Sequence, residues 1–252
     1  MVSKTKKTKV VGMVPARLES SRLPGKALIE IEGLPMAIHT CRRAKLSKSL
    51  DDVYLVTDSE EIRKAGEKHN IAVIMTGKHH KTGSDRLAEA CQGVECDIVV
   101  NVQGDEPLVN PRHIDEIVAP LIKDPKLQIA VGVTRYNEKA RTSDIKAVLD
   151  LKSNVLYCSR SDLPSDARVL VKEQLKMCFI VPFRKGFLLQ YASWSPTPLE
   201  SIEFNEYLRV IEHGIKMRAV LIDDAKISVD TPDDLKIVKE LMKKDKIRKQ
   251  YA

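Results

Sequence analysis

The sequence predicts an α/β fold in which a mostly parallel central sheet has helices on both faces, with a smaller β-rich portion attached. Between residues 10 and 122, short β-branched runs alternate with segments of helical spacing, as in successive βαβ units. Two of these runs end in charged loops, at 15–26 and 103–107, and parallel sheets hold ligands beyond the carboxyl ends of their strands. Beyond residue 129 the alternation loosens into β-rich runs with longer connections.

The individual elements follow from apolar runs and helix caps. Strands are expected at 10–14, 53–56, 72–75, 98–102, 129–134, 147–149, 155–158 and 177–181. Helices are expected at 36–46, from Glu60 behind Ser59, through Leu87 behind Thr82 or Ser84, from Asn110-Pro111, and at 186–191, 202–212 and 233–246. The capping residues are Ser, Thr and Asn, whose side chains accept hydrogen bonds from the first free backbone N–H groups of a helix.

The chain has 252 residues, of which 43% are hydrophobic and 31% are charged. We expect a single α/β domain over 10–252, preceded by a flexible basic tail at 1–9. No apolar run approaches the roughly 18–20 residues of a membrane-spanning helix, and no signal segment follows the basic start. We therefore expect a cytoplasmic protein without a membrane partner. The five cysteines have no paired spacing, which indicates neither a disulfide framework nor a zinc knuckle.

The net charge of +7 is concentrated at the two ends of the chain. Residues 1–9 hold four lysines, and residues 236–249 hold seven basic and two acidic residues, so the remaining body carries a net charge of −2. Aromatic residues make up only 4% and offer few platforms for stacking bases. The sequence therefore gives little support for a nucleic-acid partner.

A cationic loop follows the first expected strand. It carries Arg17, Arg22 and Lys26 within ten residues, next to Pro24 and Gly25. Guanidinium groups grip phosphate oxygens in pairs and an ammonium adds a point charge, so this loop is suited to a triphosphate. It is neither a Walker A loop nor a dinucleotide-binding loop. A solvated surface loop is the alternative.

Two aspartates are candidates for holding a divalent cation. Asp105 follows the strand at 98–102, and Asp230 lies just before Pro232. Carboxylate oxygens are the ligands that magnesium (Mg²⁺) prefers. The alternatives are an acidic turn for Asp105 and helix capping for Asp230.

A third signal is the segment Lys81-Thr82-Gly83-Ser84-Asp85-Arg86. A turn rich in hydroxyl groups and glycine at a helix start can present backbone groups to a base or an anion, or can simply cap the helix. The neighbouring pair His79-His80 is not expected to bind zinc, because adjacent histidines point apart and no third ligand is evident.

Together these segments resemble the CMP-Kdo synthetase (3-deoxy-manno-octulosonate cytidylyltransferase) family. The resemblance covers nearly the whole chain in the family's order. The shared segments are Pro15-Ala16-Arg17, Ser21-Arg22-Leu23-Pro24-Gly25-Lys26, Gly33-x-Pro35-Met36, Thr57-Asp58, Thr82-Gly83-Ser84-Asp85-Arg86, Asn101-Val102-Gln103-Gly104-Asp105-Glu106-Pro107, Tyr157-x-Ser159-Arg160, Pro196-x-Pro198-Leu199-Glu200, Leu208-Arg209 and Val229-Asp230-Thr231-Pro232.

The resemblance implies a nucleotide-diphospho-sugar transferase fold, a homodimer, and the activation of a 2-keto sugar acid by CTP with Mg²⁺ for lipopolysaccharide or capsule synthesis. It implies that 129–215 forms the sugar-binding and dimerisation portion. By the same likeness, the triphosphate is held by Arg17, Arg22 and Lys26, and magnesium is held by Asp105 and Asp230. The residues implied around the nucleotide are Pro15, Ala16, Gly83, Ser84, Arg86 and Gln103. Those implied at the sugar site are Arg160, Glu206, Tyr207, Met177 and Val181.

The chain departs from the family pattern where the sugar is expected. The family's His-x-Gly-x-Tyr is here Met177-Cys178-Phe179-Ile180-Val181, and its Glu-Gln-Leu-Arg is Glu206-Tyr207-Leu208-Arg209. Three polar contacts have thus become Met, Val and Tyr. A less polar site gains little from a polyol, so Kdo or a related sugar acid with an apolar group is expected.

Other functions stay open at this point. They are a transferase of the same fold with a different acceptor, a non-catalytic nucleotide-binding paralogue, and a nucleic-acid-binding protein that uses its basic ends. The last requires residues 1–9 and 240–252 for function, whereas the enzyme hypothesis expects these ends to be largely dispensable.

Overall fold

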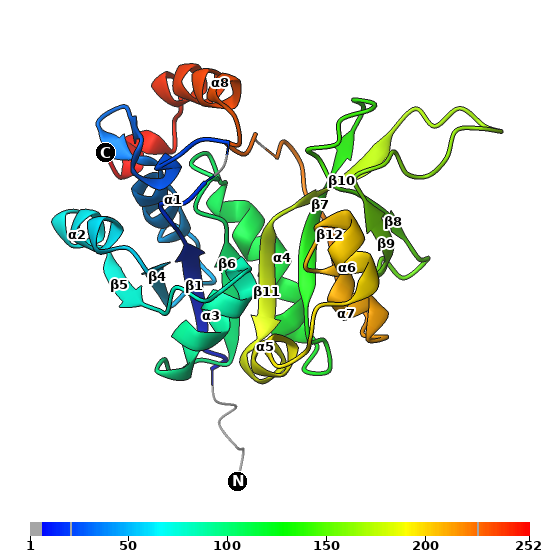
Figure 1. Ribbon diagram of the computed structural model, residues 1–252, viewed down its shortest axis with the longest axis horizontal. Coiled ribbons are helices and arrows are strands. Elements are labelled where there is room, and N and C mark those ends of the chain that lie inside the picture. Colours follow the sequence, from blue (N-terminus) through cyan, green and yellow to red (C-terminus); the bar gives the residue numbers. More distant parts are fainter. Residues whose placement is uncertain (1–6, 21, 226) are drawn as a thin grey trace, which may run out of the picture.

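A five-stranded sheet built around the first strand positions the charged loops of the amino-terminal half. In the computed structural model, which describes residues 7–20, 22–225 and 227–252, its order is β11-β6-β1-β4-β5 (Figure 1). The strands are β1 (Val10–Pro15), β4 (Asp52–Thr57), β5 (Ala72–Met75), β6 (Ile98–Val102) and β11 (Ile180–Arg184). All neighbours pair in parallel except β11, which is antiparallel to β6. The predicted mostly parallel central sheet is confirmed.

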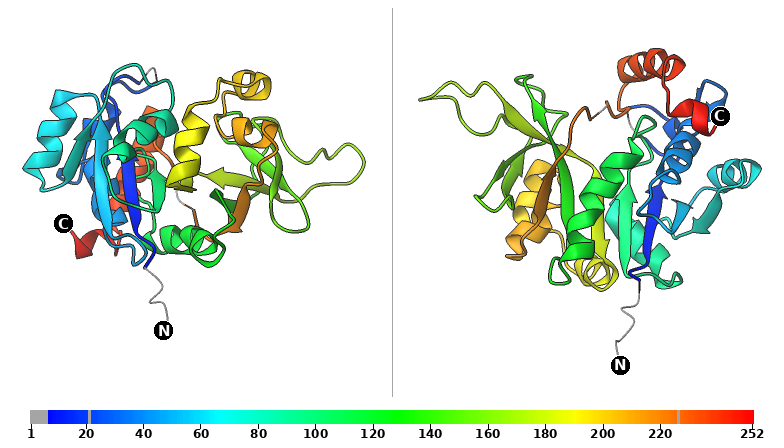
Figure 2. Two further views of the ribbon diagram at one scale, coloured as in Figure 1. Left: turned by 90° about the horizontal axis from the view of Figure 1, so that it is seen from below. Right: turned by 180° about the vertical axis from the view of Figure 1, so that it is seen from behind.

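Helices cover both faces of this sheet because the strand side chains alternate between two cores. Val10 and Val14 pack with α1 (Met36–Ala44), α2 (Glu60–Lys68) and α4 (Pro111–Lys123). Val11 and Met13 pack in a second cluster with α3 (Gly83–Gln92) and α5 (Lys185–Ala192). Figure 2 shows the helices on the two sides of the sheet.

The helix starts follow the expected caps. Ser59 accepts a hydrogen bond from the backbone N–H of Ile62, and Asn110 accepts one from that of Arg112. Of the two candidates before α3, Thr82 is the cap, since its hydroxyl accepts from the N–H of Asp85.

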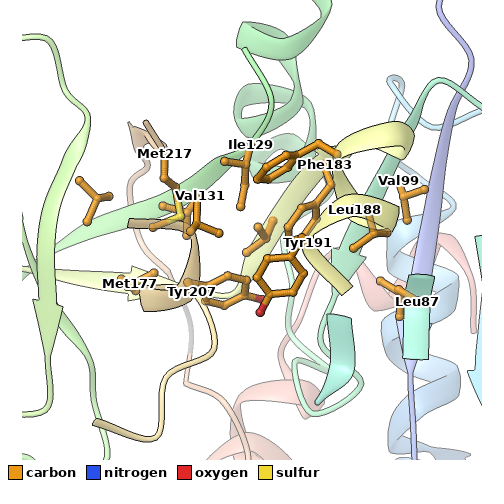
Figure 3. Packing of buried hydrophobic residues seen from close by; sticks show 14 of the residues in the cluster. Leu87, Val99, Ile129, Val131, Met177, Phe183, Leu188, Tyr191, Tyr207 and Met217 are labelled. Carbon is orange, nitrogen blue, oxygen red and sulfur yellow. The ribbon is translucent and has the colours of Figure 1, made fainter. Parts of the chain in front are cut away.

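A second five-stranded sheet, of order β12-β7-β10-β8-β9, lies beside the first (Figure 1). Its strands are β7 (Ala130–Tyr136), β8 (Lys146–Leu149), β9 (Val155–Ser159), β10 (Gln174–Cys178) and β12 (Arg218–Leu221). The loop between β9 and β10 extends away from the sheet (Figure 1). One hydrophobic cluster joins both sheets, because Val131 and Met177 pack in it together with Phe183 (Figure 3).

Two expectations for the carboxyl-terminal half were wrong, and two elements of the fold were not expected. The run 177–181 is not one strand, because the chain passes at Phe179 from β10 in the second sheet to β11 in the first. The run 202–212 is two helices, α6 (Pro198–Glu203) and α7 (Leu208–Glu212), separated by Phe204 in the left-handed conformation with φ 49°. Strand β12 was not expected. The short hairpin of β2 (Glu30–Ile31) and β3 (Leu34–Pro35) was not expected either.

The described residues at both ends of the chain contact the rest of the protein. Residues 1–6 of the expected tail lie outside the described residues, while the backbone N–H of Lys9 donates to Asp97 at 2.7 Å. The last helix, α8 (Pro232–Lys243), is followed by a segment that packs on α1. There the Arg43 guanidinium binds Asp245 at 2.9 Å, and His39 Nδ1 lies 2.8 Å from the Tyr251 hydroxyl oxygen. These contacts argue against a dispensable carboxyl terminus.

Among the described residues, none of the helices combines the length and the apolar character that crossing a bilayer requires.

Candidate functional site

The two predicted cation-binding aspartates meet at one lysine. Lys26 begins a short 3₁₀ turn (Lys26–Leu28) behind Gly25, whose φ of 66° suits glycine. Its ammonium lies 2.6 Å from Asp105 Oδ2 and 3.3 Å from Asp230 Oδ1, although the two aspartates are far apart in the sequence. Arg22 donates to the same Asp230 oxygen at 2.8 Å. Burial opposes the charge of Lys26, but the two carboxylates outweigh it and raise the Lys26 pKa.

A cavity of about 270 Å³ opens beside this cluster at the carboxyl ends of β1 and β6. Its lining includes most of the residues predicted for the nucleotide and its triphosphate, which are Pro15, Ala16, Arg17, Arg22, Lys26, Gly83, Arg86 and Gln103, together with the predicted magnesium ligands Asp105 and Asp230. Ser84 is fully buried and does not line the cavity. A side chain at Gly104 would place its Cβ 2.6 Å from the Pro15 carbonyl oxygen, so only glycine lets these two strand ends lie so close.

A second cavity, of about 310 Å³, adjoins the first and extends over the second sheet. The two cavities share Arg22, Gln103, Asp105 and Asp230. Four of the residues predicted for the sugar line it, and these are Arg160, Met177, Glu206 and Tyr207. Val181 does not, because it is fully buried in β11, paired with Asn101. The aspartate pair therefore lies where a ligand in one cavity would meet a ligand in the other.

Comparisons with known proteins show which family the chain belongs to. The model of the cytidylyltransferase family matches residues 11–218. A 3-deoxy-manno-octulosonate cytidylyltransferase of Geobacter metallireducens is 39% identical, over 92% of this chain and 98% of its own. One from Bdellovibrio bacteriovorus is 36% identical, over 93% and 98%. The chain belongs to the 3-deoxy-manno-octulosonate cytidylyltransferase family.

Solved structures agree on the fold. The structure of a CMP:2-keto-3-deoxy-manno-octonic acid synthetase complexed with CTP superposes with a TM-score of 0.90 at 34% identity, over 94% of this chain and 99% of its own. A cytidylyltransferase from Leptospira borgpetersenii, 18% identical with a TM-score of 0.65 over 94% of this chain and 88% of its own, shares the fold. The fold class implied by the resemblance is therefore confirmed.

Within the family fold, the Arg160 guanidinium is held by main-chain carbonyl groups. Its Nε donates to Glu203 at 2.9 Å, one terminal nitrogen donates to Thr142 at 2.9 Å, and the other donates to Phe204 at 3.3 Å. These acceptors are neutral carbonyl groups, and the arginine lines the second cavity. This arrangement suits an anionic ligand.

Glu206 and Tyr207 line the second cavity just before α7 begins. Burial raises the pKa of Glu206, and the Tyr207 hydroxyl accepts a hydrogen bond from Asn101 at 3.3 Å. The Tyr191 hydroxyl donates to the backbone carbonyl of Glu206 at 2.9 Å. These bonds fix the start of α7 against the first sheet.

The sequence did not predict the hydrogen bonds that hold the backbone at Arg160. The Glu203 carboxylate accepts from the Ser159 hydroxyl at 2.6 Å, from the Tyr157 hydroxyl at 3.0 Å and from the Arg160 backbone at 2.9 Å. Burial opposes ionisation of Glu203, but these donors together lower its pKa. The spacing Tyr157-x-Ser159-Arg160 was the available signal, but it does not point to a partner more than forty residues away.

Arg86 has structural partners besides its place in the first cavity. Its guanidinium donates to Asp58 at 2.9 Å and to the Thr76 hydroxyl at 2.8 Å. This ion pair ties the start of α3 to the ends of β4 and β5.

The expectation that His79 and His80 lack a third group was wrong. The two rings face each other with centroids 4.1 Å apart, and both approach the Glu89 carboxylate. Glu89 also accepts from the backbone N–H of Gly77 at 3.0 Å, and its contact with His80 lowers the Glu89 pKa. This cluster closes the loop beside the first cavity, and His79 is largely exposed.

Proposed function

We propose that this protein transfers the cytidylyl group of CTP to a 2-keto sugar acid, Kdo or a related sugar, with release of pyrophosphate. The observation that supports this most is the meeting of Asp105 and Asp230 at Lys26, where two adjoining cavities share a boundary. CTP occupies the first cavity and the sugar acid occupies the second. The reacting atoms then meet beside the aspartate pair.

Asp105 and Asp230 are also the residues that we propose hold magnesium. Both carboxylates reach one ammonium group, so they are close enough to share a cation, and oxygen donors suit Mg²⁺. When bound, the ion would neutralise phosphate charge and favour loss of the proton from the attacking hydroxyl group. The ammonium group of Lys26 balances the charge of the two aspartates, and it is also placed to contact the phosphates.

The chain's own residues act mainly by positioning and by charge. Arg17, Arg22 and Lys26 hold the triphosphate, and the Gly83 turn and Gln103 lie around the nucleotide. The anomeric oxygen of the sugar attacks the α-phosphorus, its proton is lost, and the bond to pyrophosphate breaks in line. Fixed cations stabilise the negative charge on the phosphoryl oxygens, and no covalent intermediate is needed.

The proposed enzyme works as a homodimer. The second sheet and the loop that extends from it expose the apolar side chains of Leu151, Leu156, Val169 and Leu170. Val169 and Leu170 are adjacent in the chain, and contiguous exposed apolar groups commonly mark a protein interface. A second copy of the chain would cover them.

The activity is tested by pyrophosphate release from CTP and Kdo in the presence of Mg²⁺. We expect release with the wild type, and a rate reduced by a factor of about 100 or more with Asp105→Ala. ATP, GTP and UTP serve as nucleotide controls. No release with CTP would overturn the activity, and unchanged release with Asp105→Ala would overturn the role of this carboxylate.

A further inference from the structure

The cavity that we assign to the sugar acid has an apolar wall. We use this name for Met177, Phe179, Phe204 and Tyr207, which all line the cavity. Phe179 lies where the chain leaves β10 for β11, and its ring stacks on that of Tyr207 with centroids 6.0 Å apart and planes at 21°. The chain has only four phenylalanines, so half of them lie at this one cavity.

Phe204 is held at the mouth of this cavity in an unfavourable state. Its side chain is 82% exposed, and its backbone is left-handed, with φ 49° and ψ 46°. A bulky residue rarely adopts this conformation. Arg160 maintains it by donating to the carbonyl groups of both Glu203 and Phe204. An apolar ring that is exposed at a ligand cavity is stabilised when an apolar ligand group covers it.

The wall gives a hydroxyl group little to bind. Its polar atoms are the thioether of Met177, which is a weak acceptor, and the hydroxyl of Tyr207, which Asn101 already contacts. A sugar hydroxyl buried against the wall would lose hydrogen bonds to water without replacing them. Arg160 and Lys176 also line the cavity, but the Arg160 guanidinium already donates to carbonyl groups and the Lys176 ammonium already lies 3.4 Å from Asp144.

We propose that the acceptor carries an apolar group in place of a side-chain hydroxyl, and that Phe179 and Phe204 select for it. This inference rests on the proposed function. The carboxylate and the reacting hydroxyl share carbon 2 of the sugar acid, so that carbon must face Asp105 and Asp230. We assign to the wall the hydroxyl groups outside the sugar ring, which are those of the side chain at carbons 7 and 8.

The test compares three acceptors by pyrophosphate release with CTP: Kdo, 7-deoxy-Kdo and 8-deoxy-Kdo. We expect kcat/KM for one of the deoxygenated acids to exceed that for Kdo by about 10-fold or more, which is the size of effect that one such group has in an apolar pocket. A kcat/KM for Kdo that equals or exceeds both others overturns the inference and leaves the proposed function standing. No release with any of the three overturns the proposed function and the inference together.

Two variants locate the selectivity in the wall. Phe204→Asn keeps a residue that tolerates the left-handed backbone, and Phe179→Ala removes the stacked ring. We expect both to lower the ratio of kcat/KM between the preferred deoxygenated acid and Kdo toward one. Ile202→Asn is the matched control, because Ile202 is 73% exposed on the same helix, outside the cavity lining, and should leave the ratio unchanged. Phe204→Asn removes no buried contact. If the kcat/KM ratio is unchanged in this variant, the selectivity belongs to other residues and the role of the wall is overturned.

Discussion

The buried ammonium of Lys146 donates to the carbonyl oxygen of Arg160 at 2.5 Å, and to those of Arg141 and Asp144 at 2.8 and 2.9 Å. All three acceptor residues line the second cavity, and they lie on the two loops that follow β7 and β9. Lys146 itself is fully buried and is not part of either cavity lining. It is therefore a positioning residue that fixes the loops through their backbones.

Lys146→Met should raise KM for the sugar acid about 10-fold and leave KM for CTP within a factor of about two, because only the loops of the second cavity lose their anchor. Steady-state kinetics with each substrate varied in turn measure this split. Lys152→Met, on the exposed turn that follows β8, is the control and should change neither value. An equal rise in both KM values would show a general loss of structure instead of a positioning role.

The sequence predicted the amino-terminal half well because its signals are local. Apolar runs and caps at Ser59, Thr82 and Asn110 determine where strands end and helices begin. The charged loops could also be placed at the sheet edge, since that edge follows from the strand order of a parallel sheet. The meeting of Asp105 with Asp230 at Lys26 needed the resemblance, because no local pattern relates residues so far apart.

The carboxyl-terminal half was harder to predict because its decisive interactions are long-range. The break at Phe179 lies within a continuous apolar run, so composition alone gives no boundary between β10 and β11. The turn at Phe204 lacks the glycine that normally marks a left-handed residue, since Arg160 supplies the stabilisation from another strand. No sequence pattern distinguishes Lys146 from an exposed lysine, because its three carbonyl acceptors are brought to it by the fold.

Asp230→Asn tests the second carboxylate of the proposed magnesium pair. We expect the Mg²⁺ concentration at half-maximal rate to rise about 10-fold or more, because one anionic oxygen donor is lost. Titration of pyrophosphate release with MgCl₂ measures it. The control is Asp233→Asn, an exposed carboxylate three residues away that pairs only with Lys236 in the described interactions. The same Mg²⁺ dependence in both variants would remove Asp230 from the proposed site.

Asp245→Asn should lower the free energy of unfolding by about 2–3 kcal/mol. The Arg43 guanidinium is almost completely buried, and the variant leaves its charge without an ionic partner. Urea denaturation at neutral pH measures the change. Lys244→Ala, an exposed neighbour, should have no comparable effect. If the variant is as stable as the wild type, the carbonyl oxygens of Leu108 and Val109, to which Arg43 also donates, are sufficient to stabilise the buried guanidinium.

Glu203→Gln tests whether the ionised carboxylate that accepts from the Arg160 backbone stabilises the protein in a pH-dependent way. The folded-state pKa of Glu203 lies below its ordinary value of 4.5, so its ionised form contributes stability above that pH. This contribution is lost as the pH falls through the folded-state pKa. We therefore expect the variant to be less stable than the wild type by about 1–2 kcal/mol at pH 7, and the difference to shrink below pH 4.5. Urea denaturation at both pH values measures it, and a difference independent of pH would contradict the assignment.

Leu170→Asp tests the proposed homodimer. Leu170 lies on the loop that extends from the second sheet, and its side chain is 72% exposed. A stable interface needs an apolar centre from which water is excluded. A carboxylate placed there would lose its hydration on dimerisation, and because this costs free energy, the two copies stay apart. Sedimentation should give the wild type a mass twice that of the 28.3 kDa chain and the variant the mass of one chain. Leu241→Asp, at a leucine of α8 that is 43% exposed, controls for charge and should stay dimeric, because α8 lies beside α1 and away from that loop (Figure 1). A wild type that sediments as a single chain would remove the dimer, and a dimer that persists in Leu170→Asp would move its interface to another surface.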